Sequence, residues 1–413
     1  MSPVNSADSN ATAVSRARPA DQNAAVAASF LGWTLDAFDY FLVVYCLTAI
    51  GRDFHKSDAQ MALAITITLA FRPVGAFLFG LMADRYGRRL PLMVDLIFYS
   101  VVEVATGFAP GYTSFLILRA LFGIGMGGEW GVGASLAMEK VSPKFRGLIS
   151  GILQQGYALG NLLAALCYFF LFSRWGWRPM FFLGGLPALL ALFVRVRVKE
   201  SEVWHKSKKA DWRELRGAIF ANWRLFVYLT VLMAMMNFAS HGTQDMYPTF
   251  LQRYWHFDAS KRSLISAFSG VGAICGGIVI GYYSDKSGRR RAIITGLLLA
   301  VLMIPVWALA PNVPILIAGA FLMQFMVQGA WGAIPAHLSE LSPDSVRGFL
   351  PGFAYQCGVV FSGTIGYIQA AFAEHFSYAT TMALSAGIIF LIGSVVAGLG
   401  RERHAREFGV THE

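Results

Sequence analysis

Long apolar stretches follow one another along most of the chain, separated by short polar breaks. Each is about 20 residues long, which is what a helix needs to cross the hydrocarbon core of a bilayer. Charged residues make up 14% of the chain, against about 25% in an average soluble domain. Because lipid cannot satisfy backbone N–H and C=O groups, and because the period-two alternation of membrane strands is missing, the sequence predicts an all-α membrane protein.

The apolar stretches predict twelve transmembrane helices: 24–50, 61–83, 90–109, 112–139, 146–172, 176–198, 223–252, 262–284, 290–309, 312–338, 347–372 and 376–400. Of the 34 Lys and Arg residues, Arg72 and Arg119 lie inside these spans and away from their ends. Seven fall on one side of the predicted membrane, namely Arg52, Lys56, Arg174, Arg178, Arg253, Lys261 and Arg262. All the others lie on the other side, so the bias predicts that both termini are cytoplasmic. It also explains the net charge of +10 without a nucleic-acid partner.

The chain repeats itself at an offset of 201 residues. The segment GLMADRYGRR at 80–89 recurs as GYYSDKSGRR at 281–290. Two six-helix halves related as parallel repeats match one known transporter architecture. We therefore divide the chain into a cytoplasmic tail, a first half, a cytoplasmic linker, a second half and a second cytoplasmic tail, at 1–23, 24–198, 199–222, 223–400 and 401–413.

The doubled loop, G-x-x-x-D-R/K-x-G-R-R, resembles the signature of the major facilitator superfamily, at equivalent places in both halves. The resemblance implies the major facilitator fold, with twelve helices in two six-helix pseudo-repeats. The acid at the helix end and the loop arginines can pair and hold neighbouring helices together in one state. The alternative is that the loop charges only orient the helices in the membrane. The expected conformational latch comprises Gly80, Asp84, Arg85, Gly87, Arg88, Asp285, Gly288 and Arg289.

Ionisable side chains inside the predicted spans cost about 2.5–3.5 kcal/mol each at the bilayer centre, so each is a functional candidate. Arg72 offers a guanidinium fork that suits a substrate carboxylate, and the alternative is a structural ion pair with Asp36 or Asp39. Asp36 and Asp39 share one face of the first helix. One of them is a candidate proton carrier and the other a candidate partner for an arginine. Asp95 and Glu103 are further ionisable residues within spans.

Arg119 and Glu129 bracket a glycine-rich stretch that resembles the helix-4 motif of proton-coupled members of the superfamily. Glu103 is a candidate partner for Arg119, so this arginine serves either structural pairing or proton coupling.

The seventh predicted span carries a polar stripe, with Asn237, His241 and Asp245 at i, i+4 and i+8. Gln244 widens the stripe, and the repeat offset makes Tyr40 of the first helix equivalent to His241. Because His titrates near physiological pH, a His241–Asp245 pair is a candidate proton carrier.

The string NFASHGTQDMYPT at 237–249 resembles the helix-7 signature of the lactate/pyruvate:proton symporters within the sialate:proton symporter family. The resemblance implies substrate or proton roles for the helix-7 stripe and, over a shorter matched segment, for Arg72. The expected substrate-binding residues are Arg72, Asn237, His241, Gln244 and Tyr40. The expected proton-coupling residues are Asp36, Asp39, Arg119, Glu129, His241 and Asp245.

The leading interpretation is a monomeric symporter of the cell (inner) membrane that imports protons with a short monocarboxylate such as lactate or pyruvate. The alternative is a symporter of sialic acid or another organic anion, which the same resemblance also covers. Drug efflux is disfavoured because the fifth span lacks the Gly-Pro pair typical of antiporters. An enzyme is disfavoured because no metal-ligand spacing, nucleophile motif or phosphate loop is present, so no metal or cofactor is expected. A nutrient sensor is disfavoured because the predicted tails are short.

Overall fold

The computed structural model describes residues 19–206 and 211–409, which are almost entirely helical and contain no strand. Residues 1–18 and 410–413 of the predicted tails, and 207–210 of the predicted linker, lie outside the described residues. The first helix begins at Pro19, inside the stretch expected to be tail.

The first half consists of α1 (Pro19–Asp53), α2 (Asp58–Tyr86), α3 (Arg89–Gly107), α4 (Tyr112–Lys140), α5 (Arg146–Trp175), α6 (Arg178–Leu183) and α7 (Leu186–Arg197). Two short helices, α8 (Glu202–Lys206) and α9 (Trp212–Ala221), follow in the linker. The second half consists of α10 (Trp223–Gln244), α11 (Tyr247–Arg253), α12 (Ala259–Ser287), α13 (Arg289–Ala308), α14 (Val313–Gly332), α15 (Ile334–Leu341), α16 (Leu350–Ser362), α17 (Ile365–Phe372) and α18 (Tyr378–Leu399). Single 3₁₀ turns, η1 (Pro143–Phe145) and η2 (Asp344–Val346), precede α5 and α16.

Several predicted spans are built from two helices with a short break. Pro187, Pro248 and Pro335 stand at the start of α7, α11 and α15, where a residue without an N–H interrupts the helical ladder. The eleventh predicted span is divided into α16 and α17 around Gly363, with no proline at the break. Eleven apolar spans long enough to cross a membrane are found among the described residues instead of twelve, and the stretch of α16 and α17 is not among them.

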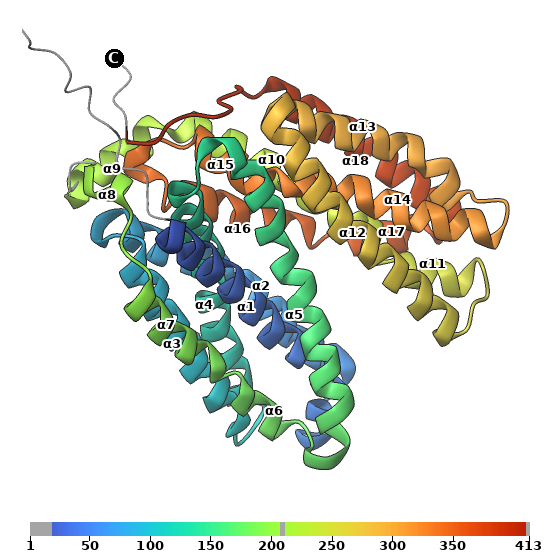
Figure 1. The fold of residues 1–413 in the computed structure, drawn as a ribbon. Helices are drawn as coiled ribbons and strands as arrows, with labels where there is room; N and C mark the ends of the chain where they lie inside the picture. Colours follow the sequence, from blue (N-terminus) through green and yellow to red (C-terminus); the bar gives the residue numbers. More distant parts are fainter. Residues whose placement is uncertain (1–18, 207–210, 410–413) are drawn as a thin grey trace, which may run out of the picture.

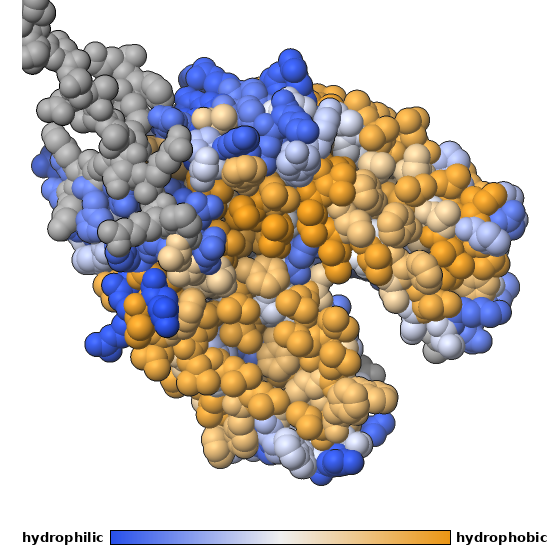
Figure 2. Space-filling model, in the orientation of Figure 1, coloured by the Kyte–Doolittle hydropathy of each residue, from blue (hydrophilic) through white to orange (hydrophobic). Residues whose placement is uncertain are grey.

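The two halves form separate bundles that meet at one end and diverge toward the other (Figure 1). The meeting end, which we call the closed end, carries α8, α9, α15 and the chain after α18. The diverging end carries α6 and α11. Figure 2 shows apolar side chains over the flanks of both bundles and polar ones at the two ends, as in a protein that crosses a bilayer.

Glycines allow the helices within each half to approach closely. A Cβ on Gly75 of α2 would lie 1.7 Å from the backbone oxygen of Ile124 in α4. The position one repeat later, Gly276 of α12, has the same relation to Phe325 of α14, at 2.0 Å. Small residues at helix contacts are the usual way for membrane helices to pack, because lipid provides no hydrophobic drive. The repeat seen in the sequence is therefore also a repeat in packing.

Candidate functional site

Asp84, near the end of α2, joins the two halves at the closed end. Its Oδ1 accepts a hydrogen bond from the backbone N–H of Gly348 at 2.7 Å, and its Oδ2 accepts one from Phe349 at 2.9 Å. These two N–H groups stand where α16 begins, and a helix start favours a carboxylate. Asp84 of the first half thus binds α16 of the second half through both oxygens.

The second copy of the motif makes the same contact in the opposite direction. Asp285, near the end of α12, accepts hydrogen bonds from Gly147 at 2.7 Å and Leu148 at 2.9 Å in the first turn of α5. The contacts are related by the 201-residue offset. The predicted latch acids therefore lie where the halves meet, and their role in switching stays a prediction.

Arg88 and Arg289 each bind the acid of their own motif and a second carboxylate from a neighbouring helix. Arg88 pairs with Glu139 of α4 at 3.0 Å, and Arg289 pairs with Glu340 of α15 at 3.0 Å. Burial opposes the charge of Arg88, but Glu139 and Asp84 outweigh it and raise the pKa of the guanidinium above its usual value. The first arginine therefore stays charged, which keeps its contacts to both acids.

The motif glycines permit this approach. Gly87 and Gly288 have φ angles of 98° and 94°, in the region that favours glycine. A Cβ on Gly80 would lie 2.8 Å from the Cα of Phe349, so α2 reaches the second half only because this residue has no side chain. Arg85 lies with its guanidinium 6.0 Å from the ring of the next residue.

The chain after α18 folds back over the closed end. The ring of Phe408 lies between two arginines of opposite halves, with its centroid 3.9 Å from Cζ of Arg146 and 3.7 Å from Cζ of Arg347. Cation–π contacts of this kind contribute about 0.5–2 kcal/mol each. The described part of the predicted second tail, 401–409, therefore contacts both halves.

Away from the closed end, the space-filling view shows a hollow between the halves (Figure 2). Arg72 of α2 lies at the boundary between the halves, with Cζ 5.8 Å from the ring centroid of Tyr355 in α16. The side chain is buried, and its Nε and Nη2 have no hydrogen-bond partner. The alternative of an ion pair with Asp36 or Asp39 is not found, since no oxygen of either carboxyl group has a partner. Arg72 therefore has no carboxylate partner in this conformation, and its polar contact is with Tyr355.

The predicted stripe on α10 is only partly continuous. His241 Nδ1 lies 3.2 Å from Asp245 Oδ2, and both side chains are more than 40% exposed. Asp245 lies within electrostatic range of Tyr40 on α1, so the pair faces the first half. Asn237 is buried instead, and its amide donates to the Met233 carbonyl at 2.8 Å, which leaves His241 and Asp245 as the accessible part of the stripe.

Gln244 belongs to a polar network between α10 and α14. Its amide donates to Gln324 Oε1 at 2.9 Å, and Gln324 donates to Thr243 Oγ1 at 2.9 Å. Gln328 donates to Ser240 Oγ at 2.8 Å. The network brings amide and hydroxyl groups together beside the His241–Asp245 pair.

Asp36 and Asp39 are completely buried in the first half, although they share one helix face as expected. The expectation that one of them holds an arginine is wrong for this conformation, because all four carboxyl oxygens lack a partner. Arg119 is held instead by Glu103, through hydrogen bonds of 3.0 and 2.8 Å. Sequence alone gives each helix position but not the rotation that decides which acid an arginine meets.

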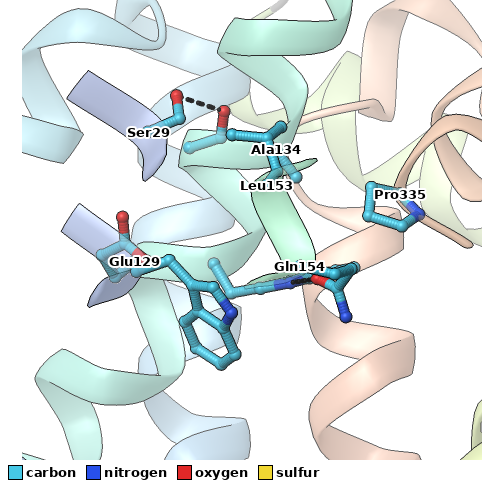
Figure 3. Close-up of a pocket in the computed structure, with 9 residues that line it drawn as sticks. Ser29, Glu129, Ala134, Leu153, Gln154 and Pro335 are labelled. Carbon is cyan, nitrogen blue, oxygen red and sulfur yellow. Dashed lines mark hydrogen bonds between the residues drawn. The ribbon is translucent and has the colours of Figure 1, made fainter. Parts of the chain in front are cut away.

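Glu129 is also completely buried without a hydrogen-bond partner for either oxygen. It lines a pocket that holds about one water, in which Pro335 of the second half stands across from Glu129 and Ser29 of the first (Figure 3). Among the described residues, no group of three or more His, Cys, Asp or Glu is placed to hold a metal ion.

Two tyrosines near Arg72 were not predicted. Tyr157 of α5 lies within electrostatic range of Arg72, Tyr40 and Asp245, and Tyr355 lies against Arg72 itself. Neither residue belongs to a repeated motif, so their positions follow from helix packing alone. Together with Arg72 and the α10 pair they surround the boundary between the halves.

Comparison with known proteins identifies the fold and the class of relatives. The Major Facilitator Superfamily sequence pattern matches residues 29–254 and 245–410. The "Carboxylic acid transporter protein homolog" of Saccharomyces cerevisiae is 28% identical, over 92% of this chain and 68% of that protein. The "Probable 4-methylmuconolactone transporter" of Cupriavidus pinatubonensis is 31% identical, over 80% and 79%. The "Sialic acid transporter NanX" of Escherichia coli is 28% identical, over 91% and 95%.

A solved structure of a proton:xylose symporter has a TM-score of 0.76 to this chain at 16% identity, covering 94% of this chain and 98% of the other. At this identity the likeness concerns the fold, and it agrees with the two-bundle architecture.

Proposed function

This chain belongs to the Major Facilitator Superfamily, as a multi-pass membrane transporter and not an enzyme, and we propose that it is a proton-coupled symporter. Its substrate is a short monocarboxylate such as lactate or pyruvate, taken up across the inner membrane. The buried guanidinium of Arg72, which has no carboxylate partner, is the observation that carries this proposal. Relatives named as transporters of a carboxylic acid and of sialic acid support an organic acid as substrate.

A buried arginine without a carboxylate partner favours an anionic ligand. The guanidinium presents a planar set of donors that fits a carboxylate in a bidentate pair. An uncompensated buried charge costs several kcal/mol, so a substrate carboxylate at Arg72 lowers the free energy of this conformation. Tyr355 and Tyr157 supply aromatic surface for the small apolar part of the substrate.

Proton coupling follows from competition for the same arginine. Asp36 lies within electrostatic range of Arg72 yet makes no hydrogen bond to it. A neutral, protonated Asp36 leaves the guanidinium available for substrate. Once Asp36 loses its proton, the carboxylate competes for Arg72 and weakens the hold on the substrate. Loss of the proton therefore promotes release of the substrate, which couples the two movements.

The bias of Lys and Arg toward the closed end supports a cytoplasmic position for that end. In this orientation the hollow faces the outside, so the conformation described is outward-facing. Import then requires the contacts of Asp84 and Asp285 to break as the halves rock about the central site.

A larger, hydroxyl-rich acid such as sialic acid is the second candidate. The amide and hydroxyl network around Gln244, Gln324 and Ser240 favours it, because a substrate with many hydroxyl groups needs many such partners.

A competition panel in proteoliposomes tests both candidates. Purified protein is given labelled lactate against unlabelled lactate, pyruvate, acetate or sialic acid, at several pH values and with or without a protonophore. We expect lactate or pyruvate to compete, and uptake to be driven by an inward proton gradient. Lactate uptake that ignores both pH and the gradient would falsify the symport mechanism, and competition by sialic acid alone would favour the second candidate.

Variants at the site test the residue roles. Arg72→Lys keeps the charge but loses the planar fork, so we expect weaker substrate binding by about 1.5–3 kcal/mol, the net value of a charged hydrogen bond. Asp245→Asn removes the charge that pairs with His241. If both variants transport as well as the wild type, the assignment of this site is wrong.

A further inference from the structure

One face of α3 carries three ionisable side chains that are completely enclosed in the first half. Asp95, Tyr99 and Glu103 stand at i, i+4 and i+8, and each is at most 1% exposed. Successive members of such a stripe are about 6 Å apart along the helix axis. Glu103 is bound by Arg119, but both Asp95 oxygens and the Tyr99 hydroxyl have no hydrogen-bond partner.

Acids from α1 and α4 lie near this stripe of α3, and together these groups form a buried column of ionisable side chains. Tyr99 lies within electrostatic range of Asp36 and Asp39 of α1, of Glu129 of α4 and of Asp95. The hydroxyl of Tyr99 is fully buried and makes no hydrogen bond to any of these four carboxyl groups in this conformation. A phenol can take a proton from one carboxyl group and give its own to another once they come within hydrogen-bond reach, directly or through one water.

Glu129 ends the column on the side of the closed end. A Cβ on Gly32 would lie 2.3 Å from its Oε1, so the absence of a side chain at Gly32 lets the carboxyl group lie against α1. Glu129 also lines the water-sized pocket whose far wall is Pro335 of the second half (Figure 3). A movement of α15 away from the first half opens this pocket, and with it Glu129, to the closed end.

Charge balance shows that most of these groups hold protons in this conformation. Within 19–206 and 211–409, the cations near the column are Arg72 and Arg119, and Arg119 is already balanced by Glu103. Arg72 can balance one carboxylate at most, and an ionised carboxyl group without a partner is too costly in such a place. At least three of four groups are therefore neutral acids: Asp36, Asp39, Asp95 and Glu129.

We propose that Asp95, Tyr99 and Glu129 form the path by which the coupled proton leaves the central site, with Glu129 as the group that releases it at the closed end. The proposal rests on the proposed symport function. When α15 moves away, Glu129 gives its proton to water and becomes a carboxylate. The proton of Asp36 then passes by way of Tyr99 and Asp95, each of which accepts one proton as it gives up its own, and restores neutral Glu129. Asp36 is left ionised beside Arg72, which displaces the substrate.

Net uptake and equilibrium exchange separate this role from a structural one. In Glu129→Gln, Asp95→Asn and Tyr99→Phe the new side chain imitates the neutral group or keeps its shape, so the fold of this conformation is preserved. We expect uptake driven by a proton gradient to fall roughly 100-fold, the usual worth of a positioned proton-transfer group. Exchange of labelled for unlabelled lactate, which needs no proton release, should stay close to the wild-type rate.

The control is Asp53→Asn, because Asp53 is half-exposed and lies beside the start of α6 at the diverging end, where it pairs with Arg178 at 3.2 Å and accepts a hydrogen bond from Trp177. Its uptake should match the wild type. Gradient-driven uptake that survives Glu129→Gln overturns the proposal. Loss of exchange together with uptake in Glu129→Gln also overturns it, because the residue then serves the whole cycle and not the proton step.

Infrared spectroscopy provides a readout that needs no substrate. Purified wild-type protein at neutral pH should show the C=O stretch of protonated carboxyl groups, and Glu129→Gln and Asp95→Asn should each remove part of this band. A wild-type spectrum without the band refutes the protonated column even if lactate transport is established. If the band is present but none of the acids is transported, the proposed substrate class fails while the proton-holding column stands.

Discussion

The two latch contacts make a prediction that can be followed at single backbone amides. Asp84→Asn keeps one oxygen acceptor but replaces the other by an NH₂ group that faces the Phe349 N–H or the Gly348 N–H. The variant loses one charge-assisted hydrogen bond, the attraction to the start of α16 and the charge that pairs with Arg88. We estimate that the closed end is destabilised by about 2–3 kcal/mol. This corresponds to a roughly 30- to 150-fold rise in the fraction of molecules in which the closed end is open.

Hydrogen–deuterium exchange of the unmutated copy is the informative measurement. The amides of Gly147 and Leu148 are bound by Asp285, which the substitution does not touch. If the closed end opens as a unit, their exchange should accelerate by the same factor as the open fraction. Faster exchange at Gly348 and Phe349 alone shows only the local loss of an acceptor.

The matched control is Asp258→Asn. Asp258 also binds a backbone N–H at a helix start, that of Lys261 at 2.8 Å, but within its own half. We expect no change at Gly147 and Leu148 in this variant. If Asp84→Asn also leaves the exchange rates of these amides unchanged, the two contacts open independently. The idea that the closed end opens as a unit is then wrong.

Three further substitutions test packing and pairing elsewhere. Gly75→Ala forces α2 away from α4, so thermal unfolding should show a loss of about 1–3 kcal/mol, whereas Gly270→Ala, with no atom within 4 Å of its new Cβ, should be neutral. Arg119→Met leaves the buried carboxylate of Glu103 without its partner and should lower the free energy of unfolding by about 3–5 kcal/mol. Adding Glu103→Met should restore most of this stability in the same unfolding assay. Phe408→Ala removes the ring between two arginines, whose contacts contribute about 1 kcal/mol. Amide exchange at the closed end should therefore accelerate roughly 5-fold. An unchanged exchange rate would mean that the tail does not stabilise the closed end.

The sequence predicted the architecture well because two independent signals agreed. Apolar length identifies a membrane helix, and the 201-residue offset fixes which helices correspond. The break between α16 and α17 was missed because it has no proline and Gly363 stands in an otherwise continuous apolar stretch. A glycine there is compatible with an unbroken membrane helix, so the sequence does not mark the break.

The site was only partly predictable, because a helical pattern gives spacing and not rotation. The His241–Asp245 pair was found, since both residues lie on one helix at i and i+4. Pairs between helices depend on packing that the sequence does not contain, and for this reason an ion pair of Arg72 with Asp36 or Asp39 stayed open as an alternative until the structure was known. Tyr355 was missed for the same reason, because it approaches Arg72 from the other half of the chain.

The crossed contacts of Asp84 and Asp285 have a consequence for the helices that receive them. Neither α5 nor α16 has a capping side chain of its own, since Phe145 and Phe349 stand in the capping positions. The acceptor that completes each helix start comes from the other half, so each half lacks part of its own secondary structure when it is alone. Separation of the halves is therefore also a local change in helix stability, in which two N-terminal turns must find water or fray. An uncapped helix start in a transporter of two repeats is a place to look for an acid from the opposite repeat.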